Sequence, residues 1–189
     1  MSRSKKSCKA IRLIGIDPGG SFTGYCVLQA SNALLKYIDS GVWDFTDNRH
    51  ESSGMKLYRL ERYLLNLIKQ SSNFRTFLAF EKIRFHGENN GVDAPQVYGE
   101  VTGTIKKVCH EYEIEHRGIH LSTARKIATG HGNIGKPEAR EFLEDLFDVR
   151  LDHGDKKVRK KIKKAFDESD AGIITLAFAK DLGWDVQER

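Results

Sequence analysis

The stretch LIGIDPGGSFTGY, residues 13–25, determines how the chain is expected to fold. An apolar run over residues 11–16 predicts a buried strand, and this strand ends on the carboxylate of Asp17. A proline and two glycines follow directly, and a second apolar run over residues 23–29 predicts a strand that returns beside the first. Asp17 is therefore expected at the tip of a buried strand.

The pattern then changes from strands to a helix and back. A third strand is expected over residues 34–45, and leucines three or four residues apart predict a helix over residues 57–68. Residues 77–81 form a short apolar strand that ends on Glu81. A strand, a crossover helix and a strand imply parallel pairing, and the strand of residues 11–17 is the obvious partner.

The second half of the chain predicts a helix over residues 94–111, a strand over 114–121, a helix from Pro137 to about Phe147 and a last helix from near Asp167 to Lys180. The order predicts an α/β protein with a mixed five-stranded sheet. Its first three strands are antiparallel, the next two are parallel, and helices cover both faces. This is the order of the ribonuclease-H-like fold.

Gly99 and Gly103 lie one turn apart in the expected helix of residues 94–111. Each costs about 1 kcal/mol of helix propensity, so glycines here indicate a place where another backbone comes close. That backbone belongs either to the protein's own sheet or to a second subunit.

Length and composition favour one domain in a reducing compartment. The 189 residues suit a single domain over residues 11–189, preceded by a basic flexible arm over residues 1–10. No apolar run approaches the roughly 20 residues that cross a bilayer, and the start lacks the apolar core of a secretory signal. We expect a cytoplasmic protein. The cysteines Cys8, Cys26 and Cys109 lack the spacing of a zinc site and are expected to be free thiols.

The net charge of +5 is concentrated in one segment, KKVRKKIKK at residues 156–164. Seven of its nine residues are basic, so the rest of the chain is slightly acidic. Such a tract usually meets a polyanion, although a solvated face or a targeting signal has the same composition. Apolar residues recur every four positions from Val158 to Phe166, which predicts an amphipathic helix. The expected DNA-binding residues are Lys156, Lys157, Arg159, Lys160, Lys161, Lys163 and Lys164.

Four acids are candidates for one site. Asp17 and Glu81 each end an apolar strand, and parallel pairing would bring both to the carboxyl edge of the sheet. Asp167 and Asp170 are three residues apart at an expected helix start and project from one face. Turn chemistry at Asp17 and helix capping by the later pair are the structural alternatives.

Carboxylates that converge repel one another unless a divalent cation offsets their charge. Hard oxygen ligands of this kind suit Mg²⁺ or Mn²⁺. Two such ions about 4 Å apart activate water and stabilise the leaving 3′ oxygen in phosphodiester hydrolysis. An acidic centre next to a basic tract therefore favours a nuclease.

The segments IGIDPGGSFTGY, AFEKI, TGHGNIGK and DESDAG occur in an order and spacing that resembles RuvC-type Holliday junction resolvases, from about residue 11 to residue 179. The basic tract and the extended start mark a divergent member and favour a phage or viral source, in which case the compartment is the host cytoplasm. The resemblance implies a homodimer that binds a four-way DNA junction. It also implies paired nicks that leave 5′-phosphate and 3′-hydroxyl ends.

The resemblance assigns roles to individual residues. Asp17, Glu81, Asp167 and Asp170 match the family's metal-binding acids, which hold Mg²⁺ or Mn²⁺, with two ions expected per site. Lys126 and Lys136 fall where the family places lysines near the scissile phosphate. The helix of residues 94–111 becomes the dimer helix, which favours the partner subunit as the neighbour of Gly99 and Gly103.

One departure from the family concerns the residues after Glu81. The family commonly carries an aromatic residue there that stacks on a junction base, whereas this chain has Lys82, Ile83 and Arg84, with Phe85 one step later. Either Phe85 or the guanidinium plane of Arg84 would then stack on the base. Lys82, Arg84 and Phe85 are therefore further expected DNA-binding residues.

Three other functions fit the sequence less well. A ribonuclease-H-like nuclease that acts on other branched DNA or on hybrids uses the same acids. An actin-like ATPase also carries a loop similar to DPGGSFTG. Such a protein needs a second acidic glycine loop, and the only candidate in this chain is LDHGD at residues 151–155, which no clear strand precedes. A non-catalytic DNA-binding module does not explain Asp17 and Glu81 together.

Overall fold

The computed structural model describes residues 10–32, 34–46, 51–83, 94–151 and 159–184. Its sheet consists of β1 (Ile11–Asp17), β2 (Phe22–Ser31), β3 (Leu34–Asp44), β4 (Arg75–Glu81) and β5 (Glu115–Ile119). The strand order is β3-β2-β1-β4-β5. The first three strands are antiparallel neighbours, and β4 pairs in parallel with both β1 and β5. The predicted mixed sheet is confirmed.

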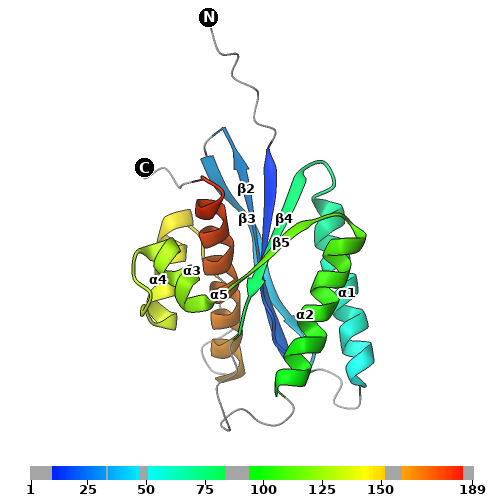
Figure 1. The fold of residues 1–189 in the computed structure, drawn as a ribbon. Coiled ribbons are helices and arrows are strands. Elements are labelled where there is room, and N and C mark those ends of the chain that lie inside the picture. The colour runs from blue at the N-terminus through cyan, green and yellow to red at the C-terminus, as the bar shows by residue number, and fades with distance from the viewer. Residues whose placement is uncertain (1–9, 33, 47–50, 84–93, 152–158, 185–189) are drawn as a thin grey trace, which may run out of the picture.

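In the part of the chain that the structure describes, five helices are assigned, and they cover the two faces of this sheet (Figure 1). On one face lie α1 (Ser53–Gln70) and α2 (Ala94–Glu111), and on the other lie α3 (Leu121–Thr129), α4 (Lys136–Phe147) and α5 (Arg159–Asp181). Each face has its own apolar core, so the sheet is buried on both sides. This layering confirms the expected α/β architecture.

The two largest departures from the sequence prediction are in the second half of the chain. The last strand ends at Ile119 instead of Leu121, and the short helix α3 follows it, which the sequence pattern did not predict. Only Ala124 and Ala128 are buried in α3, so its apolar stripe is too narrow to stand out.

The second difference concerns α5, which begins at Arg159, eight residues before Asp167. The expected lysine-rich helix and the expected last helix are a single element, because lysine is a good helix former and does not interrupt the helical pattern. Asp167 and Asp170 are therefore within a helix, and the alternative that they only cap its start is wrong.

Helix α5 lies unusually close to the first two strands. A Cβ atom on Gly15 of β1 would stand 1.9 Å from Oγ1 of Thr175, and one on Gly24 of β2 would stand 2.0 Å from the carbonyl oxygen of Asp167. Such distances are far below van der Waals contact, so only glycine fits at either strand position. The apolar residues of α5 between Ala171 and Ala179 are consequently buried, and Ile173 and Leu176 have no exposed surface.

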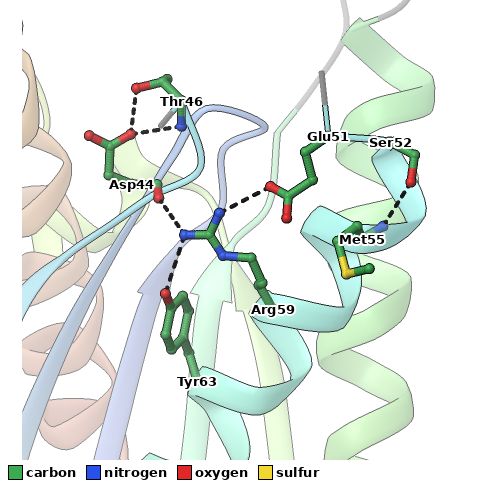
Figure 2. A network of polar contacts seen from close by, with 7 residues as sticks. All are labelled: Asp44, Thr46, Glu51, Ser52, Met55, Arg59 and Tyr63. Carbon is green, nitrogen blue, oxygen red and sulfur yellow. Dashed lines mark hydrogen bonds and ion pairs between the residues drawn. The ribbon is translucent and has the colours of Figure 1, made fainter. Parts of the chain in front are cut away.

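On the opposite face, polar contacts fasten α1 to the end of β3 (Figure 2). The Ser52 side chain caps the helix by accepting from the Met55 amide at 3.3 Å. Arg59 pairs with Glu51 at 3.0 Å and donates to the Asp44 carbonyl at 3.2 Å and the Tyr63 hydroxyl at 3.4 Å. The network joins the loop after β3 to the second turn of the helix.

The structure also bears on two expectations drawn from composition, the state of the cysteines and the lack of a membrane-spanning segment. Cys26 and Cys109 are buried free thiols, as expected, whereas Cys8 lies outside the described residues. In the part of the chain that the structure describes, no helix combines the length and apolar character needed to span a bilayer.

Substitution of Gly24 by alanine tests the close approach of α5. The new methyl group would overlap the backbone of Asp167, so we expect Gly24→Ala to lower the free energy of unfolding by about 3 kcal/mol or more. Gly54→Ala in α1 is the control, because no described atom lies within 4 Å of its added Cβ, and it should stabilise the protein by up to about 1 kcal/mol. Urea unfolding measures both, and equal effects would contradict the packing described.

Candidate active site

The ends of β1 and β4 bring the first two acids together. The parallel register pairs Ile16 with Phe80, so Asp17 and Glu81 follow at adjacent strand ends. Their side chains share a hydrogen bond, and Asp17 keeps only 9% of its surface exposed. The strand-tip arrangement expected from the sequence is therefore present.

Helix α5 adds the second pair of acids to this edge. Gly24 pairs with Asp17 across β1 and β2, and the backbone of Asp167 lies directly against Gly24. Asp167 is thus held beside Asp17 by the glycine contact. Asp170, almost one turn further along α5, is 1% exposed.

Burial and the neighbouring acids act on the carboxyl group of Asp17. Burial, the hydrogen bond with Glu81, and the negative charges of Glu81, Asp170 and Asp167 together raise the pKa of Asp17 well above its ordinary value of 3.8. The other three acids therefore all act on Asp17, although the four come from three separate segments of the chain. The site favours a bound cation because a cation would relieve this repulsion.

Two basic side chains hold Asp170. Nη2 of Arg125 lies 2.9 Å from its Oδ1, and Nζ of Lys136 lies 2.9 Å from its Oδ2. Arg125 also donates to the Ile134 carbonyl at 3.0 Å, which fastens α3 to the loop before α4. Burial lowers the pKa of Lys136, but the hydrogen bond to Asp170 and the charges of Asp170, Asp17 and Asp167 outweigh this effect, so the pKa is raised overall.

A cavity of about 290 Å³ opens beside the acids. It is lined by Asp17, Asp167 and the turn residues Pro18, Gly19, Gly20, Ser21 and Phe22. Within the described ranges, no three His, Cys, Asp or Glu side chains are yet arranged as a set of metal ligands, and Asp170 is engaged with Arg125 and Lys136. The oxygen donors nevertheless suit a hard divalent cation, which at Asp170 would compete with the positive charges of Arg125 and Lys136.

The two lysines predicted near the scissile phosphate lie in different surroundings. Lys136 lies among the acids, whereas Lys126 is exposed and, among the described residues, pairs with no carboxylate. Its neighbour Arg125 occupies the position beside Asp170 instead. Sequence reasoning missed Arg125, because only the direction of α3 decides which of the two adjacent basic residues faces α5. The helical spacing of Arg125 from buried Ala124 and Ala128 was the available signal.

The expected DNA-binding residues are only partly within the described structure. Lys82 is exposed directly after Glu81, and its amide donates to the Ile119 carbonyl at 2.8 Å. Arg84, Phe85, Lys156 and Lys157 lie outside the described residues. Five further basic residues belong to the first turns of α5, where the backbone alone is described: Arg159, Lys160, Lys161, Lys163 and Lys164.

Gly99 and Gly103 lie on the outer surface of α2. Both are exposed, and a Cβ added at either position would have no atom of the described residues within 4 Å. The alternative that these glycines admit the protein's own sheet is therefore wrong. The surface is free to contact another chain.

Comparison with known proteins identifies similar sequences. The family model described as crossover junction endodeoxyribonuclease RuvC matches residues 13–165, which include Asp17 and Glu81 and end just before Asp167. A protein of that description from Orientia tsutsugamushi (strain Boryong) is 26% identical over 159 residues, covering 84% of this chain and 89% of the relative. One from Prochlorococcus marinus subsp. pastoris is 25% identical over 175 residues, covering 93% and 100%.

Solved structures share the fold. Thermus thermophilus RuvC in complex with a Holliday junction substrate has a TM-score of 0.71 at 16% identity, covering 92% of this chain and 96% of that chain. The yeast mitochondrial Holliday junction resolvase has a TM-score of 0.60 at 13% identity, covering 89% and 77%. The expected ribonuclease-H-like fold is confirmed.

The repulsion among the acids predicts how Asp17→Asn behaves. Folding raises the pKa of Asp17 above its ordinary value of 3.8, so the unfolded chain loses this proton at a lower pH than the folded protein does. The free energy of unfolding therefore falls as the pH rises from 3.8 through the raised pKa. Asp17→Asn should therefore raise the unfolding temperature at neutral pH without metal, by an amount that shrinks towards pH 4. Mg²⁺ should stabilise the wild type and have little effect on the variant.

The control for this measurement is Asp145→Asn, an identical substitution at an exposed position of α4. Differential scanning fluorimetry at several pH values, with and without Mg²⁺, checks the expectation. An Asp17→Asn protein that is stabilised by Mg²⁺ as strongly as the wild type would remove Asp17 from the metal site.

Proposed function

The chain belongs to the RuvC family of crossover junction endodeoxyribonucleases, and from this membership we propose that it is a structure-selective endonuclease that resolves four-way DNA junctions. The observation that carries the proposal is the convergence of Asp17, Glu81, Asp167 and Asp170 at one edge of the sheet. A protein of the same fold has been solved with a Holliday junction substrate, which supports a branched DNA as the ligand.

The four acids would hold the divalent metal on which the family depends, Mg²⁺ or Mn²⁺, and we propose two ions per site. Bound there, the ions would activate water and stabilise the leaving 3′ oxygen, which gives 5′-phosphate and 3′-hydroxyl ends. The protein's own contribution is to gather the carboxylates at one edge before the metal arrives, since β1, β4 and α5 position their backbones independently of any ligand.

The basic residues have separate tasks in this proposal. Arg125 holds Asp170 in place, and Lys136 keeps a positive charge beside the acids that attracts a phosphodiester. Lys82 and the basic tract of residues 156–164 would contact the DNA backbone on either side of the site, where each phosphate contact adds affinity that salt weakens.

We further propose that the protein acts as a homodimer through α2. Gly99 and Gly103 have no side chains of their own, and a Cβ added at either position would meet no described atom within 4 Å, so the backbone of a second helix could approach there. Two sites in one symmetric particle would account for paired nicks in two strands.

A nuclease of the same fold that cuts other branched DNA or hybrids is the second candidate, because the acids alone do not select a substrate. Incubation with Mg²⁺ and a labelled four-way junction, a splayed duplex, a hybrid or a linear duplex separates the two. We expect symmetric nicks at the junction that Asp17→Asn abolishes and Asp145→Asn retains. Equal cutting of all four substrates would reject junction resolution in favour of the broader nuclease.

The dimer is tested by Gly103→Arg, which adds a long charged side chain to the outer surface of α2. Multi-angle light scattering after gel filtration should show a dimer for the wild type and a monomer for the variant. Gly54→Arg is the control, because Gly54 of α1 is equally open. A wild-type monomer, or a variant that remains dimeric, would contradict the proposed interface.

A further inference from the structure

The start of α2 touches both strand ends that carry the first two acids. Cγ1 of Val97 would lie 2.6 Å from a Cβ added to Gly20, in the turn after Asp17. The next residue, Tyr98, is half-buried, and its hydroxyl reaches the end of β4. One turn of α2 therefore borders the turn after Asp17 and the end of β4.

The Tyr98 hydroxyl makes two hydrogen bonds with the backbone around Glu81. It donates to the Glu81 carbonyl at 2.5 Å and accepts from the Ile83 amide at 3.1 Å. These two groups flank Lys82, whose own amide points the other way and donates to Ile119 of β5 at 2.8 Å. The backbone that carries Glu81 is thus fixed from both sides.

The sheet register explains why a side chain is needed there. Ile16 pairs with Phe80, and continuing this parallel register by two residues would place Pro18 opposite Lys82. In a parallel ladder the residue at that place would donate its N–H to the Glu81 carbonyl and accept from the Ile83 amide through its own carbonyl. Proline has no N–H, and β1 ends at Asp17.

Tyr98 therefore supplies both hydrogen bonds that the first strand does not make. Without them, the carbonyl of Glu81 and the amide of Ile83 would each lose a partner at a partly buried edge. The orientation of the Glu81 side chain follows from the backbone that these bonds hold. An adjacent residue, Gly99, lies on the outer surface proposed for the partner subunit.

We propose that Tyr98 is a positioning residue: its hydroxyl replaces the missing continuation of β1 and so fixes Glu81 for metal binding. The inference rests on the proposed function only in assigning Glu81 to the metal site. The contacts themselves do not depend on the substrate, so metal binding tests the role of Tyr98 apart from DNA cleavage.

The test is Tyr98→Phe, which removes the hydroxyl and keeps the ring. We expect the Mn²⁺ concentration for half-maximal binding, measured by electron paramagnetic resonance, to rise by about 10- to 100-fold, as for other residues that orient a ligand. Junction binding in Ca²⁺ should be unchanged, while kcat for cleavage at low Mg²⁺ falls and recovers at high Mg²⁺. The matched control is Tyr63→Phe, which loses a hydroxyl contact with Arg59 in α1.

The outcomes separate the two proposals. A wild-type protein that binds no Mn²⁺ and cuts no junction defeats the proposed function itself. A wild type that does both, together with a Tyr98→Phe variant of unchanged Mn²⁺ midpoint, overturns only the role of Tyr98. A lower unfolding temperature without a shift in the Mn²⁺ midpoint also overturns it, because the hydroxyl would then be purely structural.

Discussion

The contact between α5 and the first two strands is the constraint on which the rest of the structure depends. Gly15 and Gly24 leave no room for a side chain, and the helix backbone occupies that space. The contact buries the apolar face of α5 and, at the same residues, sets Asp167 beside Asp17. The same close approach therefore determines both the packing of α5 and the position of the acids. The distance between α5 and the sheet sets the distance between Asp17 and Asp167, which lie near opposite ends of the chain.

Once the acids are gathered, charge balance governs the site. Burial and then the neighbouring negative charges raise the pKa of Asp17, while Arg125 and Lys136 form ion pairs with Asp170. A protein that assembles such a site retains an electrostatic cost in its folded state, and a divalent cation removes that cost. The electrostatic cost that lowers the stability of the metal-free protein thus also favours the binding of a divalent cation.

The sequence was sufficient for features that depend on local pattern. Asp17 and Glu81 were predictable as strand-tip neighbours because each ends an apolar run, and the parallel pairing followed from the intervening helix. The choice between Arg125 and Lys126 was not, because it depends on how α3 faces α5. The role of the Tyr98 hydroxyl was also not predictable from the sequence. Its need follows from the register of β1 and β4, which would place Pro18 where a strand residue would otherwise bond to the backbone around Glu81.

The central claim is that four carboxylates from β1, β4 and α5 form one divalent-metal site. Anomalous diffraction from crystals soaked in Mn²⁺ measures this directly. We predict Mn²⁺ bound to oxygens of Asp17, Glu81 and at least one of Asp167 and Asp170, with Lys136 withdrawn from any carboxylate that ligates the metal. Crystals in which these carboxylates keep their present partners, and in which Mn²⁺ binds elsewhere or not at all, would contradict the account.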